Sequence, residues 1–316
     1  MPQDADERRR SQRIGIALAL AGAACFSAKA IFVKLLYAQG LDVTTTFAMR
    51  MVVALPFFVL LALWQGTAGL ASLDRRDRLG IVGCGLLGFY LSSWLDFIGL
   101  SYIPASLERL ILFLYPTFVV LLSRLLHGTA LTRSGAVALA LSYGGVVLVV
   151  WQSLDLTGSA SALALGTAFT LASAFTYACY VIASTRVITR IGSLRFTAYA
   201  STVACVASIV HFGVTHDAAQ MLAAPSSALG LALGLGTVAT VLPILLVAEA
   251  LRRLGATQVA LLSSVGPVVT IALAWLLLGE SISLLQSMGA ALVIAGVVLV
   301  GLRPAARPAA RPAATH

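Results

Sequence analysis

Four ionisable side chains stand inside long apolar stretches of the first half of the chain: Lys29, Arg50, Asp96 and Glu108. An ionisable group near the middle of a membrane-spanning helix costs about 2.5–3.5 kcal/mol on insertion scales, so each one needs a reason to be there. When depth is counted along helices that rise about 1.5 Å per residue, all four fall in the same, outer half of the membrane. We therefore expect these charges to pair with one another.

Two explanations of this group of charges stay open. In the first, it is a structural network of ion pairs, and Lys34 and Arg109, which are nearest to span ends, reach toward the interface. In the second, the group forms a polar wall or gate of an outward-facing cavity, which binds a zwitterion or transfers protons through Asp96 or Glu108.

Aromatic side chains with polar tips recur at helical spacing in two other stretches. Tyr90 and Trp94 are four residues apart, and Tyr177 and Tyr180 are three apart, so each pair lies on one helix face. Such stripes serve helix packing more often than ligand binding. A cavity at mid-depth would nevertheless use side chains of this kind, so all four are binding or gating candidates.

Prolines supply a third set of candidates, because a proline within a helix frees a backbone carbonyl and permits a bend. Pro116, Pro243 and Pro267 interrupt apolar runs and are candidate hinges.

For two acidic residues, Glu249 and Glu280, we expect structural roles rather than binding or gating roles. Glu249 is close to two arginines and predicts a salt bridge, and Glu280 follows a glycine in a turn, where we expect it to cap the next helix.

The residue types give no support to enzyme catalysis or to a metal centre. No serine, histidine and acid lie at one depth, and the histidines show no metal-binding spacing. The four cysteines lie in apolar runs without CxxC spacing. The glycines at 80, 83, 85 and 88 lie inside a span and predict close helix packing rather than nucleotide binding. We expect no catalytic residue, metal or cofactor.

The elements that carry these residues are membrane-spanning helices. Hydrophobic residues make up 59% of the chain and charged residues 10%, whereas about 25% of a soluble protein is charged. About 20 apolar residues cross a bilayer as a helix. Ten runs qualify, the first too long for a cleavable signal. They are 14–37, 44–64, 79–100, 105–126, 132–151, 161–184, 194–214, 226–251, 256–278 and 283–302.

The basic residues indicate the orientation of these spans. All of them except Lys29, Lys34, Arg50 and Arg109 fall in the tails, loops or span ends of one side. The positive-inside rule therefore places the tail 1–13 and the disordered basic tail 303–316 in the cytoplasm, the latter able to contact anionic lipid. The net charge of +9 is scattered between the spans, which argues against nucleic-acid binding.

The two halves of the chain are similar to each other. A shift of 151 residues places Pro116 on Pro267 and Gly145 on Gly296. Each half has five spans, an odd number, so the second half enters from the opposite side. The sequence predicts an all-α membrane protein of ten helices, an inverted 5+5 repeat with halves 14–151 and 161–302, which is a layout that supports alternating access.

This pattern resembles the ten-span, EamA-type branch of the drug/metabolite transporter superfamily over residues 14–302. The second half carries the signature residues Pro267, Gly279, Glu280, Gln286, Gly289 and Gly296, and the first half has Thr129 in place of the glutamate. The resemblance implies cofactor-free secondary transport in the plasma (bacterial inner) membrane, often export, of amino acids, nucleosides, other metabolites or drugs.

The leading hypothesis is therefore a secondary transporter of a small organic molecule, with export favoured by family analogy. Proton coupling and passive facilitation both stay open, as does the oligomeric state. Two alternatives remain: an intramembrane lipid-modifying enzyme, for which only Asp96 with Glu108 could supply catalytic groups, and a membrane scaffold subunit.

Overall fold

The computed structural model describes residues 2–65, 73–127, 133–157 and 159–301, and within these ranges the regular structure is entirely helical. The first half contains α1 (Pro2–Ala38), α2 (Val43–Trp64), α4 (Arg75–Cys84), η1 (Gly85–Leu91), α5 (Ser92–Tyr102), α6 (Ala105–Leu112), α7 (Tyr115–His127) and α8 (Arg133–Thr157). The second contains α9 (Ala160–Ile191), α10 (Ser193–Thr215), α11 (Ala218–Leu222), α12 (Ser226–Gly236), η2 (Thr237–Val241), α13 (Leu242–Leu254), α14 (Ala256–Ser263), α15 (Gly266–Leu278) and α16 (Leu284–Gly301).

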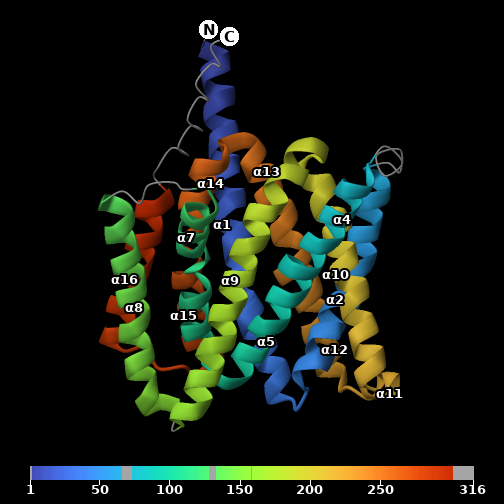
Figure 1. Ribbon diagram of the computed structural model, residues 1–316, viewed down its shortest axis with the longest axis vertical. Helices are drawn as coiled ribbons and strands as arrows, with labels where there is room; N and C mark the ends of the chain where they lie inside the picture. Colours follow the sequence, from blue (N-terminus) through green and yellow to red (C-terminus); the bar gives the residue numbers. More distant parts are fainter. Residues whose placement is uncertain (1, 66–72, 128–132, 158, 302–316) are drawn as a thin grey trace, which may run out of the picture.

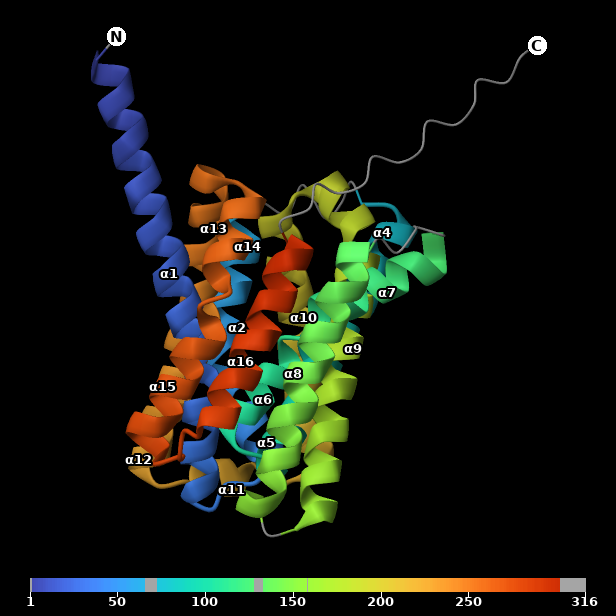
Figure 2. The same cartoon turned by 90° about the vertical axis from the view of Figure 1, so that its left-hand side faces the viewer.

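These helices form the ten crossings that the hydropathy pattern predicts. Nine stretches of the described chain are long and apolar enough to span a bilayer, and the shorter apolar helix at Leu284–Leu299 provides the tenth. The described part of α1 begins within the N-terminal tail, and the helix projects beyond the bundle (Figure 2). α1 begins and α16 ends at the same end of the bundle (Figures 1 and 2), which we call the basal end; the opposite end is the distal end.

The helix ends have ordinary local causes. Asp42 precedes α2 and its carboxylate accepts hydrogen bonds from the backbone N–H groups of Thr44 (2.7 Å) and Thr45 (3.0 Å), which satisfies free donors of the first turn. Gly192 and Gly255 have φ of 85° and 79°, a region that favours glycine, and each allows a sharp turn into the next helix.

The two halves share backbone irregularities at equivalent positions. The third and eighth crossings each contain a π-helical segment, η1 and η2, and the fourth and ninth crossings are each broken, between α6 and α7 and between α14 and α15. The prolines lie in the first turns that follow these irregularities: Pro116 in α7, Pro243 in α13 and Pro267 in α15. Pro116 and Pro267 therefore stand near a helix start, where a proline needs no N–H partner, whereas Pro243 follows η2 within the unbroken helical crossing Ser226–Leu254.

Helices of the two halves pack against each other. α1 contacts α13 and α15, α2 contacts α10, α5 contacts α9, and α8 contacts α16; α8 and α16 lie side by side in both views (Figures 1 and 2). Glycines permit the close approaches, as expected for helices in a membrane. A Cβ on Gly85 would lie 2.6 Å from a backbone oxygen of α10, and one on Gly88 would lie 2.2 Å from Tyr180. This confirms close packing at the glycine-rich stretch.

Candidate functional site

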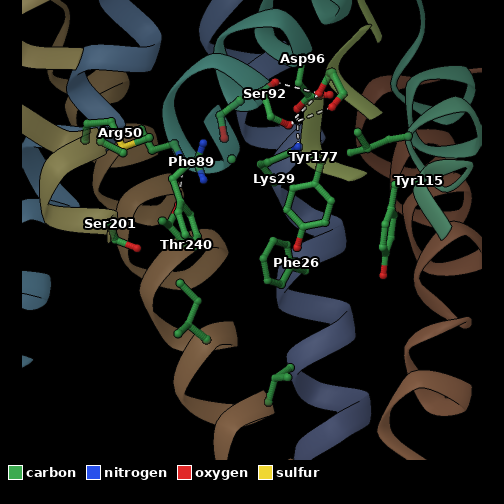
Figure 3. Close-up of a pocket in the computed structure, with 18 of the residues that line it drawn as sticks. Phe26, Lys29, Arg50, Phe89, Ser92, Asp96, Tyr115, Tyr177, Ser201 and Thr240 are labelled. Carbon is green, nitrogen blue, oxygen red and sulfur yellow. Dashed lines mark hydrogen bonds and ion pairs between the residues drawn. The ribbon is translucent and has the colours of Figure 1, made fainter. Parts of the chain in front are cut away.

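A cavity of about 240 Å³ lies inside the bundle, between the two halves. Its wall is mostly apolar and aromatic and carries a few charged side chains (Figure 3). The charged lining residues are Lys29, Arg50, Asp96 and Arg109, and the aromatic ones are Phe26, Phe58, Phe89, Phe113, Tyr115 and Tyr177. An apolar pocket with a few polar groups is the usual form of a small-molecule site.

The cavity extends from the charged group toward the basal end. On α1, which starts at that end, the lining residues run from Ala23 to Lys29 and stop there. On α2, which runs the opposite way, they begin at Arg50 and continue to Phe58. The charges thus cap the distal end of the cavity. The expectation that they form a wall or gate of an outward-facing cavity stays a prediction, because it depends on which end of the bundle faces outward.

The cap of the cavity is a lysine between two carboxylates. Lys29 forms an ion pair and a hydrogen bond with Asp96, and its ammonium nitrogen lies 3.6 Å from Oε1 of Glu108. The Glu108 side chain is fully buried. Both carboxylates thus lie within 4 Å of the same ammonium nitrogen. Three of the four expected charges therefore do meet.

Arg50, the fourth, is not ion-paired with this cluster. Its Nε donates a 2.8 Å hydrogen bond to the hydroxyl of Thr240, in η2 of the second half, and its guanidinium lies 5.5 Å from the ring centre of Phe97. Nη1 has no hydrogen-bond partner among the described residues. The π-helical segment η2 places the Thr240 hydroxyl where it can accept this hydrogen bond from Arg50. A hydropathy pattern does not indicate a π-helical segment.

One of the two explanations offered by the sequence has Arg109 reach toward the interface; the structure places it in the cavity wall. Its guanidinium lies beside Gly266, the first residue of α15, where a Cβ would be 3.1 Å from Nη2. Its Nε is buried without a hydrogen-bond partner. The break of the fourth crossing at Phe113 and Leu114 makes α6 a short helix, and Arg109 faces inward from its last turn. A depth count that treats the fourth crossing as one unbroken helix does not show that Arg109 faces the cavity.

The aromatic candidates separate into two groups. Tyr177 lines the cavity, whereas Tyr180 packs with Phe89 and Phe196. Tyr90 and Trp94 are not among the lining residues. The Tyr90 hydroxyl is 2.8 Å from Nδ1 of His211. The rings of Tyr90 and Trp94 both pack against Phe47 and against the imidazole of His211.

Glu280 does not cap the next helix, as the sequence led us to expect. Its carboxylate accepts hydrogen bonds from the backbone N–H groups of Ala105 (2.7 Å) and Ser106 (3.2 Å) and from the Ser106 hydroxyl (2.6 Å). It therefore caps α6 in the other half, while Ser283 caps α16. Local sequence spacing suggested the wrong helix, because the partner is 175 residues away in the chain.

The salt bridge predicted for Glu249 is confirmed. Its carboxylate accepts 2.7 Å hydrogen bonds from Arg252 and Arg253 at the basal end of α13. Within the described ranges, no group of three histidine, cysteine or acidic side chains is placed to hold a metal ion. The Lys29–Asp96–Glu108 cluster can hold a proton, and the cavity beside it can hold an organic solute.

Comparisons with known proteins identify a family and two similar transporters. The model of the EamA-like transporter family matches residues 13–151 and 164–302. The chain is 31% identical over 297 residues to "Uncharacterized transporter YcbK" of Bacillus subtilis, covering 92% of this chain and 93% of that one. It is 27% identical to "Uncharacterized transporter YdfC" of the same organism over 73% of each chain. A crystal structure superposes with a TM-score of 0.63 at 17% identity over 90% of this chain, which supports the fold alone.

Proposed function

Because the chain belongs to the EamA-like transporter family, we propose that it is a secondary transporter that exports a small organic metabolite or drug by alternating access around the central cavity. The family consists of transporters, which decides against the lipid-modifying enzyme. The observation that carries the proposal is a mostly apolar cavity, bordered by both halves and capped at one end by buried charges.

Alternating access requires that the distal end can open when the basal end closes. The distal end is held by contacts between the halves, above all by the carboxylate of Glu280 on α6. The paired breaks after Leu112 and after Ser263 provide equivalent points at which the two halves can bend. The conformation with access from the basal end is then one of two related states.

The lysine–dicarboxylate cluster supports a proton as the coupling ion. Asp96 and Glu108 share one ion-pair partner, Lys29, and two buried carboxylates that share one ammonium are costly to keep ionised. One proton shared by the carboxyls removes this cost. Release of that proton would leave a charge that favours reopening of the site to water. Because Asp96 lines the cavity, its protonation state would change the affinity of this end of the cavity for a charged solute.

We place the chain in the plasma (bacterial inner) membrane with both termini cytoplasmic. Arg75, Arg190 and Arg253 lie on helices or turns at the basal end, where α1 begins, and the positive-inside rule assigns that end to the cytoplasm. The cavity then has access from the cytoplasm. Fusions of a cytoplasmic and a periplasmic reporter to the C-terminus test this directly; activity of the periplasmic reporter would refute it.

Transport itself is tested with purified protein in liposomes loaded with a panel of metabolites and drugs, with and without a pH gradient. We expect release of at least one solute, faster with a gradient. Arg50→Ala and Asp96→Asn should each reduce this rate at least tenfold while the protein still inserts. Arg195→Ala is the matched control, because Arg195 is half-buried but bonds to the Gln65 carbonyl outside the cavity. Failure to move any solute would refute the proposal.

A further inference from the structure

The charged groups of the cavity do not balance. Its lining contains three cations, Lys29, Arg50 and Arg109, and one carboxylate, Asp96. Glu108 lies outside the lining, beside Lys29; even with both carboxyls ionised one positive charge is in excess, and a proton shared by them raises the excess to two. Among the described residues, no carboxylate lies within salt-bridge distance of Arg50 or Arg109. Lys29 has two acidic partners within 4 Å, whereas in the described structure the carboxylates of Asp96 and Glu108 lie farther than that from both arginines.

Both arginines keep buried N–H groups free. Arg50 is 7% exposed, and its Nη1 has no hydrogen-bond partner. Figure 3 shows its guanidinium group directed into the space between Thr240 and Lys29. The Nε of Arg109 is likewise buried without a hydrogen-bond partner. A buried guanidinium that lacks an acceptor is costly, and an acid group that bonds it in two places removes the cost.

We propose that the solute is an organic anion with an aromatic or other apolar body. Its carboxylate or equivalent acid group binds Arg50 and Arg109, and its body lies against Phe26, Phe89 and Tyr177, which line the same cavity. The volume of about 240 Å³ is below the about 300 Å³ at which typical ligand pockets begin, so the solute is small. This inference rests on the proposed transport function and names its substrate class.

Binding is tested on the detergent-solubilised full chain with three acid–amide pairs that share shape and differ in charge. The pairs are benzoate with benzamide, phenylacetate with phenylacetamide, and indole-3-acetate with indole-3-acetamide. We expect at least one acid to raise the unfolding temperature more than its amide does. Benzyltrimethylammonium, a cation of similar size, should not raise it. If no acid raises the unfolding temperature more than its amide does, the inference is overturned.

Variants assign the effect to the arginines. Arg109→Gln and Arg50→Gln should each weaken the apparent affinity for the acid about 10- to 100-fold, the effect expected for a lost charge-assisted hydrogen bond. Arg195→Gln, outside the cavity, should leave it unchanged. Equal affinity in both cavity variants and the control would overturn the inference. If Arg50→Gln does not fold, Arg109→Gln and the acid–amide comparison still test whether the cavity binds an acid group.

Flux measurements separate this inference from the proposed function. Release of the bound acid from liposomes supports both. Binding of an acid to the arginines without flux of any solute supports the anion site and refutes transport. Flux of cations or neutral solutes, with no preference for acids, leaves transport standing and overturns the anion site.

Discussion

Ser106 donates both its hydroxyl (2.6 Å) and its backbone N–H (3.2 Å) to Oε2 of Glu280, 174 residues further along the chain. The serine is the second residue of α6 in the first half, and the glutamate follows α15 in the second half. One side chain thus joins the two halves at the distal end of the bundle by capping a helix of the opposite repeat. The equivalent position of the first half is Thr129, so the sequence itself is asymmetric at this position.

Removing that cap should loosen the distal end. We expect Glu280→Ala to lower the free energy of unfolding by about 1–3 kcal/mol, because it leaves charge-assisted hydrogen bonds unmade. Thermal unfolding in detergent measures this. Asp217→Ala is the control, since Asp217 accepts a bond from the N–H of Ala219 and caps only the short helix α11. An unfolding temperature for Glu280→Ala no lower than that of the control would contradict the role given to Glu280.

The Lys29 ammonium should be essential to the stability of the fold. Lys29→Met leaves Asp96 and Glu108 buried without their ion-pair partner, which we expect to cost about 3–5 kcal/mol. The yield of folded protein and its unfolding temperature should both fall. Addition of Glu108→Gln should restore part of the loss, because it removes one uncompensated carboxylate. Lys34→Met, on the same helix without a salt bridge in the described structure, should have a smaller effect; equal effects would argue against the cluster.

Two neighbouring glycines of α8 should differ sharply in their tolerance of a side chain. A Cβ on Gly145 would lie 2.5 Å from the backbone oxygen of Gly289 in α16, whereas one on Gly144 would meet nothing within 4 Å. Gly145→Ala should destabilise by about 1–3 kcal/mol through overpacking. Gly144→Ala should be neutral or slightly stabilising, because alanine favours a helix. Thermal unfolding of the two variants decides; equal midpoints would contradict the α8–α16 packing.

Access to the cavity should come from one side of the membrane. Ser93 lines the cavity and is half-buried. In a chain whose four cysteines are replaced, Ser93→Cys should react with a membrane-impermeant thiol reagent from the side where α1 begins, and slowly from the other. Ser193→Cys and Ser227→Cys, exposed at the basal and distal ends respectively, calibrate the two sides. Faster reaction of Ser93→Cys from the distal side would contradict the basal access of the cavity.

Hydropathy and charge distribution predicted the crossings and their inverted halves for a simple physical reason. A helix satisfies its own backbone hydrogen bonds in lipid, so apolar runs of sufficient length must be helical crossings wherever they occur. The depth of a charge follows from its distance along such a run. On this basis the meeting of Lys29, Asp96 and Glu108 could be expected from the sequence alone.

Only the tertiary structure decided which way each charge faces and with what it pairs. Depth does not specify direction around a helix axis, and the breaks and π-helical segments change that direction locally. Arg50 therefore bonds to Thr240 rather than to a carboxylate, Arg109 faces the cavity, and Glu280 caps a distant helix. These contacts depend on how helices from opposite halves pack together, which no local pattern of residues encodes.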